Sequence, residues 1–135
     1  MQVKEIMHNV AKISSDISIS EVAGIMDEKS IGSVLIEEDN RIIGIMTERD
    51  ILRKIVAKKE NPDILRAKDI MSCPIITIDI EEDIEVASRK MCHHKIRRLI
   101  VTENDEIIGK ITANSIARNL KYLSVRNSPV HTRLE

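Results

Sequence analysis

Aromatic residues are almost absent from this sequence. It contains no phenylalanine or tryptophan, and its aromatic fraction is 1%, all of it Tyr122. Proteins that hold single-stranded nucleic acid stack the bases on aromatic side chains, which this chain cannot offer. An excess of positive charge is also lacking, since the formal net charge is −1. We therefore expect no nucleic-acid partner, because non-specific binding to phosphates requires a basic surface.

Cysteine and long apolar stretches are scarce as well. Cys73 and Cys92 have no partner at zinc or redox spacing, and one pair does not make a disulfide scaffold in a chain of 135 residues. No apolar run is long enough for a membrane span, and no signal-peptide core follows residues 1–5. We therefore expect a cytoplasmic protein with two free thiols and no membrane partner.

The sequence offers no constellation for catalysis or metal binding. Cys92, His93 and His94 are adjacent, but neighbours on a helix point in different directions, whereas helical metal sites use spacings of three or four. We interpret these three residues as a helix end that faces solvent or a dimer partner. Serine, histidine and aspartate occur without the pattern of a nucleophile and its base. We predict no catalytic residue, no metal ligand and no enzyme activity.

An internal repeat organises the chain. A shift of 65 residues places Arg41–Thr47 on Glu106–Thr112, and a shift of 64 residues places Lys4–Met7 on Lys68–Met71. The matching positions cover residues 3–120. A repeat of about 55 residues buries too little surface for comfortable independent stability. We therefore expect the two repeats to pack on each other around a pseudo-twofold axis.

Each repeat shows the same succession of elements. In the first repeat we predict strands at 10–14, 33–36 and 41–46, and helices from Ser18 and from Glu48 to about Lys59. Ser18 and Glu21 form a capping-box pattern, and Asp83 takes the cap position in the second repeat. The predicted fold class is therefore α/β (α+β), with tandem β-α-β-β-α repeats.

The predicted domains are residues 1–62 and 63–121, followed by a C-terminal tail at 122–135. Glu60-Asn61-Pro62-Asp63 ends the first repeat, since proline lacks an N–H donor and restricts the residue before it. From Lys121 onward the sequence has no apolar periodicity. We expect an extended segment there, with a partner contact or disorder as the alternatives.

Thr47 and Asp50 stand where a strand gives way to a helix. A helix N-terminus has unpaired N–H groups and a partial positive charge, which suits a phosphate. Asp50, one turn into the helix, is a negatively charged acceptor suited to hydroxyl groups. Together they would suit the phosphate and ribose of a nucleotide. Thr-x-x-Asp before an apolar run is equally an ordinary helix cap, so both interpretations stand at this point.

The repeat and the Gly44…Thr47…Asp50 pattern resemble the CBS domain pair, or Bateman module, named after cystathionine β-synthase. The resemblance covers nearly the whole chain and implies a free-standing CBS pair. It implies binding of an adenosine-containing ligand (AMP, ADP, ATP, S-adenosylmethionine or a relative) in clefts between the repeats. By the family pattern, Asp50 bonds the ribose hydroxyls and Thr47 lies near ribose and phosphate.

The resemblance also implies ligand contacts from the second repeat. By similarity to the regulatory γ subunit of AMP-activated protein kinase, a strand at Ile75-Ile76-Thr77 would line the adenine, and Ile96-Arg97-Arg98 would direct its arginines at phosphate. That subunit has a histidine where this chain has Arg97. Arginine suits phosphate because its planar fork donates paired hydrogen bonds. The alternative for both arginines is a solvated strand entry. The ligand-binding residues of this cleft are predicted to be Ile45, Thr47, Asp50, Ile75, Ile76, Ile96, Arg97 and Arg98.

A second cleft departs from the family pattern. Ser115 stands where the first repeat has Asp50, and Gly32-Ser33 stand where the second repeat has Arg97-Arg98. An uncharged serine cannot replace a carboxylate as acceptor for two ribose hydroxyls. We expect a weak or empty site, or one that holds a less charged ligand, formed by Ala11, Lys12, Ile31, Ser33, Thr112 and Ser115.

Two hypotheses of different classes follow. The first is a non-catalytic regulatory module that binds an adenine nucleotide, works as a homodimer and is read by an unknown partner protein. The alternative is a dimerisation or scaffold module with vestigial nucleotide pockets.

Overall fold

The computed structural model of the chain describes residues 1–127 and separates into two compact units. The first unit is Val10–Ile75. The second unit joins Met1–Asn9 to the residues from Ile76 onward. Each unit has its own hydrophobic core and is described by itself.

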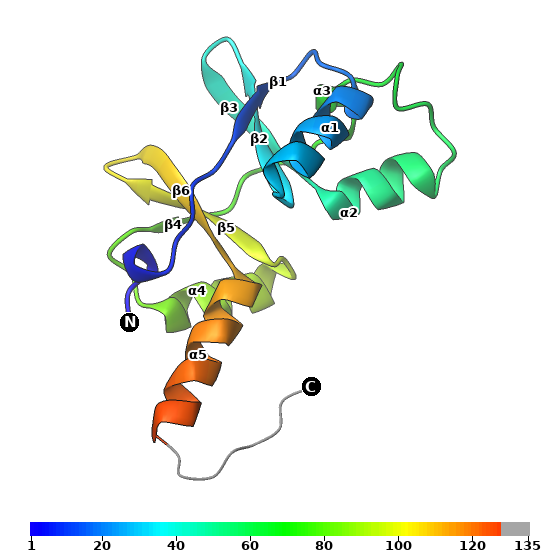
Figure 1. The fold of residues 1–135 in the computed structure, drawn as a ribbon. Coiled ribbons are helices and arrows are strands. Elements are labelled where there is room, and N and C mark those ends of the chain that lie inside the picture. Colours follow the sequence, from blue (N-terminus) through cyan, green and yellow to red (C-terminus); the bar gives the residue numbers. More distant parts are fainter. Residues whose placement is uncertain (128–135) are drawn as a thin grey trace. The chain divides into compact units, whose positions relative to one another are not determined.

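The first unit is a three-stranded sheet covered by helices (Figure 1). Its elements are β1 (Lys12–Ser14), α1 (Ile19–Lys29), β2 (Ser33–Glu38), β3 (Arg41–Thr47), α2 (Glu48–Ile51), the π-helical η2 (Leu52–Val56) and α3 (Ala67–Ile70). The strand order is β1-β2-β3. β1 pairs with β2 in parallel, because α1 carries the chain back between them, and β2 and β3 form an antiparallel hairpin.

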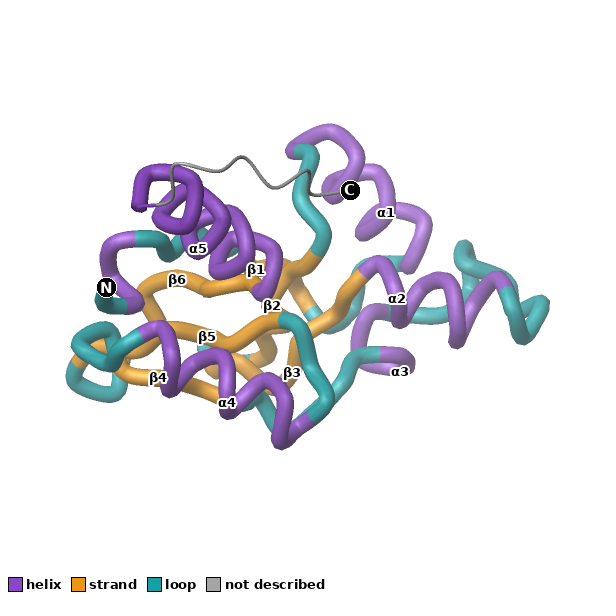
Figure 2. The backbone as a smooth tube through the Cα atoms, turned by 90° about the horizontal axis from the view of Figure 1, so that it is seen from below, coloured by secondary structure: helices purple, strands orange, loops and turns teal. Residues whose placement is uncertain are grey.

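The second unit repeats this topology (Figure 2). Its elements are η1 (Val3–Glu5), β4 (Thr77–Asp79), α4 (Ile84–His94), β5 (Arg98–Glu103), β6 (Glu106–Thr112) and α5 (Ala113–Asn127). The strand order is β4-β5-β6, again with one parallel and one antiparallel pairing. The predicted α/β fold class with two matching repeats is therefore confirmed.

Helix starts follow the predicted caps. Ser18 Oγ accepts a hydrogen bond from the Glu21 N–H at 3.2 Å, and Asp83 Oδ1 accepts one from the Glu85 N–H at 2.8 Å. Each bond satisfies a donor that the first helical turn leaves unpaired. α1 and α4 both end at a residue with left-handed backbone, Ser30 (φ 53°) and Lys95 (φ 56°).

The core of each unit lies between its sheet and its helices. Alternate residues of a strand point to the same face, so Val34 and Ile36 of β2 pack against the apolar face of α1. The first core contains Ile13, Ile19, Val22, Met26, Val34, Ile36, Met46, Ile55, Ala67 and Ile70. The second core contains Val3, Ile6, Ile78, Ile84, Ala87, Met91, Leu99, Val101, Ile111 and Ile116.

The short segment that precedes the first strand of each repeat is exchanged between the units. Ala67 and Ile70 of α3, which open the second repeat, are buried in the core of the first unit. Val3 and Ile6, which open the first repeat, are buried in the core of the second unit. The second unit is therefore discontinuous in sequence, whereas the first is the continuous segment Val10–Ile75.

Two element boundaries differ from the predicted ones. β1 begins at Lys12 and β4 at Thr77, each two residues later than predicted. The residue before each strand already accepts one bond, from Leu35 N–H to Ala11 C=O and from Ile100 N–H to Ile76 C=O. The regular pairing of each strand with its neighbour begins one residue after that single bond.

The two repeat-closing helices also differ from expectation. The helix at Glu48 becomes π-helical at Leu52 and ends at Val56, short of the predicted Lys59, whose φ of 56° is left-handed. α5 extends to Asn127, so the extended segment predicted from Lys121 is wrong for 121–127. The sequence has no proline or glycine in that stretch, and adding residues to an existing helix costs little. The rest of the predicted tail lies outside the described residues.

Candidate functional site

Asp50 is fixed at the start of α2 by a reciprocal capping box. Thr47 is the N-cap, and its Oγ1 accepts from the Asp50 N–H at 3.3 Å. In return, Asp50 Oδ2 accepts from the Thr47 N–H at 2.9 Å and from the Thr47 hydroxyl at 3.3 Å. The cap predicted from Thr-x-x-Asp is therefore present, and it orients the carboxylate.

The other carboxylate oxygen of Asp50 has two partners that the sequence did not indicate. Ser72 Oγ donates to Oδ1 at 3.0 Å, and Lys54 Nζ lies 3.1 Å from the same oxygen. Lys54 also donates to the Ile70 carbonyl at 2.8 Å. With about four acceptor positions on a carboxylate, Asp50 is saturated by these donors. Asp50 is 8% exposed, so an uncompensated charge there would be costly.

Sequence reasoning missed Ser72 because it lies in the exchanged segment. Lys54 had a usable signal, since it lies one helical turn after Asp50, at the spacing of an ion pair.

Gly44 permits the exchanged segment to cross β3. Ile45 and Ser72 exchange backbone hydrogen bonds of 2.9 and 2.8 Å, as an isolated antiparallel bridge. A Cβ at Gly44 would lie 2.6 Å from Met71 Sδ and 3.0 Å from the Ser72 carbonyl oxygen. The glycine of the repeated motif is therefore explained by a close backbone crossing, which also brings Ser72 to Asp50.

The second unit builds a version of the same cluster that contains no carboxylate. Ser115 Oγ lies 2.6 Å from His8 Nε2 and 2.8 Å from Thr112 Oγ1, which accepts the Ser115 N–H at 3.0 Å. Asn119 donates to the Ser115 carbonyl at 2.7 Å. His8 comes from the exchanged segment and pairs with Lys110 of β6. A Cβ at Gly109 would lie 2.6 Å from the His8 carbonyl oxygen.

The two clusters match position by position. Ser115 stands for Asp50, His8 for Ser72 and Asn119 for Lys54. The first cluster therefore contains a carboxylate and an ammonium group, whereas the second contains a hydroxyl, an imidazole and an amide.

The predicted ligand residues are divided between the units. Of the first set, Ile45, Thr47, Asp50 and Ile75 lie in the first unit, and Ile76, Ile96, Arg97 and Arg98 lie in the second. Of the second set, Ala11, Lys12, Ile31 and Ser33 lie in the first unit, and Thr112 and Ser115 lie in the second.

Sheet register places the arginine pair beside the second cluster. Within the second unit, Arg98 is the antiparallel partner of Thr112, and the Arg97 carbonyl accepts the first N–H of α5 from Ala113 at 2.8 Å. The equivalent partner of Thr47 in the first unit is Ser33, which is fully buried.

Among the residues that the structure describes, no group of three or more His, Cys, Asp or Glu side chains is arranged to hold a metal ion. Cys73 and Cys92 are exposed free thiols, and Cys92, His93 and His94 form the exposed helix end that was predicted. Within residues 1–127, no helix combines the length and apolar character needed to cross a membrane.

Comparison with known proteins identifies one family. The sequence profile of the CBS domain matches residues 3–57 and 67–122. An uncharacterised protein of Methanopyrus kandleri, MK0525, is 43% identical over 105 residues, which are 76% of this chain and 54% of that protein. Two further curated relatives are covered over 62% and 23% of their lengths. The chain thus spans between about a quarter and three fifths of the length of these three relatives.

Solved structures show the same fold. A protein with CBS domains from Burkholderia ambifaria superposes with a TM-score of 0.84 at 20% identity, covering 98% of this chain and 100% of that one. A hexameric CBS-CP12 protein from bloom-forming cyanobacteria gives a TM-score of 0.84 at 26% identity, covering 97% of this chain and 77% of that one.

Proposed function

The chain belongs to the CBS domain family, and from that premise we propose that it is a non-catalytic regulatory module for an adenosine-containing ligand of the AMP, ADP or ATP class. The observation that carries the proposal is the preset carboxylate of Asp50. It is buried, oriented by the Thr47 cap and surrounded by donors on both oxygens. A carboxylate held in this way can accept the hydroxyl donors of a ribose when these take the place of its present donors.

Binding of a ribose requires an exchange of donors at Asp50. The capping bonds to Oδ2 are made by the backbone and hydroxyl of Thr47 and hold the helix start. Ser72 and Lys54 bond Oδ1 through side chains that can rotate. We therefore assign Oδ1 to the ribose, whose hydroxyls replace the Ser72 hydroxyl and the Lys54 ammonium group. Replacing one donor by another avoids leaving the carboxylate unpaired.

The remaining parts of the ligand are assigned by resemblance to the family. Ile45, Ile75 and Ile76 supply the aliphatic surroundings for the base in a chain without Phe or Trp. Arg97 and Arg98 are assigned to the phosphate, which a planar guanidinium group binds through paired hydrogen bonds. In the second cluster, an uncharged Ser115 bonded to His8 replaces the carboxylate. We assign no high-affinity ribose site to it.

A second candidate function is self-association without a physiological nucleotide. Leu52 and Val56 are 60% and 63% exposed, and the structurally similar CBS-CP12 protein is hexameric. Exposed apolar side chains on a helix surface favour a protein partner. In this case the chain would form a homodimer or scaffold and its clefts would be vestigial.

A thermal-shift screen separates the two functions. The full chain is heated with adenosine, AMP, ADP, ATP, S-adenosylmethionine and NAD, each added in excess. A ligand that binds only the folded state raises Tm, by mass action. The regulatory proposal requires a rise with at least one adenosine-containing compound and its loss in Asp50→Asn. Unchanged Tm with all six compounds, in a protein that light scattering shows to be oligomeric, would favour the scaffold.

A further inference from the structure

One oxygen of Asp50 is bonded by side chains from outside the helix cap. Lys54 Nζ lies 3.1 Å from Asp50 Oδ1, and Ser72 Oγ donates to the same oxygen at 3.0 Å. Oδ2 is bonded within the cap, by the backbone and hydroxyl of Thr47. Of the donors at Oδ1, Lys54 is the charged one, and charged donors make the stronger hydrogen bonds to a carboxylate.

Lys54 has a second partner that does not depend on Asp50. Its ammonium group donates to the Ile70 carbonyl at 2.8 Å, and Ser72 Oγ lies 3.4 Å away as a further acceptor. Ile70 is the last residue of α3, and the last carbonyls of a helix have no partner within it. An ammonium group that leaves Asp50 therefore keeps a hydrogen bond that is already made.

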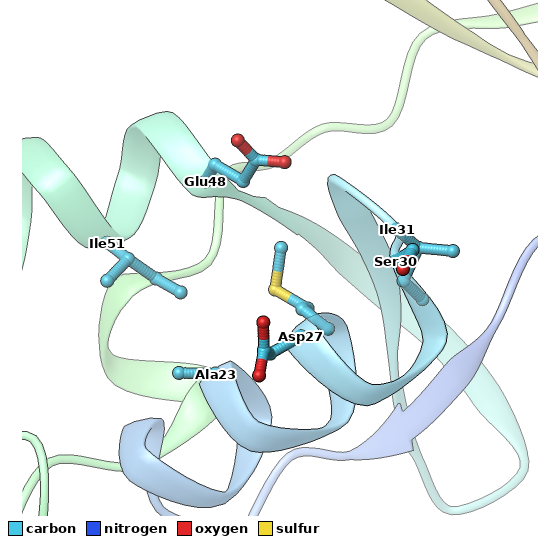
Figure 3. A pocket seen from close by; sticks show the side chains of 7 residues that line it. Ala23, Asp27, Ser30, Ile31, Glu48 and Ile51 are labelled. Carbon is cyan, nitrogen blue, oxygen red and sulfur yellow. The ribbon is translucent and has the colours of Figure 1, made fainter.

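The other carboxylate at the start of α2 lies on a different face of the helix. Glu48 lines an open hollow of about 500 Å³ between α1 and α2, together with Asp27, Ile31 and Ile51 (Figure 3). Residues two apart, such as Glu48 and Asp50, do not face the same side of a helix. Lys54 is therefore shared between Asp50 and the Ile70 carbonyl, and Glu48 takes no part.

The second unit has no equivalent of this arrangement among its described residues. Asn119 stands for Lys54, and its side chain donates to the backbone carbonyl of Ser115 at 2.7 Å. Asn119 lies in the α-helix α5, whereas Lys54 lies in the π-helical turn Leu52–Val56. π-helical turns are rare and occur frequently at functional sites. The movable cation thus accompanies the repeat that contains the carboxylate.

We propose that Lys54 is an internal competitor of the ligand. Its ammonium group occupies Asp50 Oδ1 in the free protein and stays on the Ile70 carbonyl alone when ligand hydroxyls bind that oxygen. The inference rests on the proposed function and adds to it a residue that sets the affinity. An interaction that exists in the free state and is lost on binding reduces the affinity by the factor that it contributes to the free state. Lys54 therefore stabilises the free protein and weakens the complex.

The variant Lys54→Met separates this role from a merely structural one. Methionine keeps an unbranched side chain and removes the ammonium group. The free variant should unfold at a lower temperature, because Asp50 loses its cation. It should also bind adenosine about threefold or more tightly, because water is a weaker competitor than an ammonium group. Adenosine is the probe because it carries no phosphate for Lys54 to attract. A structural residue would instead lower stability and affinity together.

Two further variants serve as controls. Lys58→Met removes the same charge four residues further along, at an exposed position, and should change neither quantity. Lys54→Arg keeps a cation at the position and should bind adenosine no more tightly than the unmodified chain. Thermal unfolding and calorimetry at pH 8, where a carboxyl group is ionised, measure all four proteins.

The outcomes distinguish this inference from the proposed function. Tighter binding by Lys54→Met alone supports the competitor. Equal or weaker binding by Lys54→Met overturns it, and if Asp50→Asn still weakens adenosine binding in the same titrations, the proposed function stands without it. If neither the unmodified chain nor Lys54→Met binds adenosine, AMP or ATP, both proposals are wrong.

Discussion

Asp50 and Ser115 occupy equivalent positions with different chemistry, and the difference lies in a few side chains. The carboxylate of Asp50 is only 8% exposed, and the ammonium group of Lys54 and several hydrogen-bond donors offset the cost of its burial. Ser115 needs no such offset, and Asn119 stands where Lys54 would be. In each cluster the residue one turn along the helix therefore suits the residue at the helix start. Changing only Asp50 would leave Lys54 without its carboxylate partner.

We expect Asp50→Asn to weaken binding of AMP at least about tenfold, because a hydrogen bond to a charged acceptor contributes roughly 1.5–3 kcal/mol. Isothermal calorimetry measures the loss. Ser115→Ala is the matched variant in the second unit and should hardly change the affinity. Chemical denaturation of both variants shows whether they remain folded. A larger effect of Ser115→Ala would mean that the two clefts have been assigned in the wrong order.

The two crossing glycines give a second contrast at the residue scale. A Cβ at Gly109 would meet a backbone oxygen at 2.6 Å, whereas at Gly44 the nearest atom is the Met71 sulfur, which can move. We expect Gly109→Ala to lower the free energy of unfolding by about 1–3 kcal/mol, as overpacking does. Gly44→Ala should cost less, because only the contact with Ser72 O, at 3.0 Å, involves backbone. Urea denaturation compares them, and equal costs would contradict this explanation of the motif.

At the scale of helices and strands, the sequence predicts the features that depend on residues close together in the chain. Ser18 and Asp83 mark helix starts because a cap is a bond between residues two or three apart. The hairpins follow from apolar runs separated by a polar turn. The exchange of the segments that open each repeat was not predicted. Ile6 and Ile70 are apolar and could be buried in the core of either unit, and only tertiary packing decides which core contains them.

The same limit applies to the candidate site. Thr47 and Asp50 are recognisable from four consecutive residues, and the capping box follows from their spacing. Ser72 approaches Asp50 from 22 residues away along the chain, through a backbone crossing that no local pattern signals. The full length of α5 follows from the absence of proline and glycine in residues 121–127, which the prediction of an extended segment did not weigh.

A matched pair of substitutions tests the exchange. Ile6 and Ile70 are equivalent, 9% and 5% exposed, and buried in different cores. Truncating a buried isoleucine to alanine costs about 2–5 kcal/mol. Ile6→Ala should lower hydrogen-exchange protection in β5 and β6, and Ile70→Ala should lower it in β2 and β3. If Ile6→Ala instead exposes β2 and β3, the segment belongs with its own repeat.

At the scale of the whole molecule, the two repeats share a fold and differ in where they place charge. The first repeat has Asp50 at the helix start and acids on the α1 surface, whereas the second has arginines at the start of β5 and cations on the α4 surface. In the proposed function, one duplicated topology would thus supply a carboxylate for hydroxyl groups from one repeat and arginines for phosphate from the other. Neither repeat alone contains both sets.

Arg97 and Arg98 should give the protein a preference for phosphorylated adenosine. Glu48 and Asp50 place negative charge near the start of α2, so a phosphate must be attracted by cations elsewhere, and these two arginines are assigned that role. We expect AMP to bind more tightly than adenosine, with a difference that shrinks as salt is added. The double variant Arg97→Ala/Arg98→Ala should abolish the difference in affinity while adenosine still binds through Asp50. The control variant Arg41→Ala/Arg66→Ala removes the same charge at two exposed positions elsewhere and should preserve the difference. Calorimetric titrations of adenosine, AMP and ATP measure all three proteins. Equal affinity of the unmodified chain for adenosine and AMP would show that it reads the nucleoside alone.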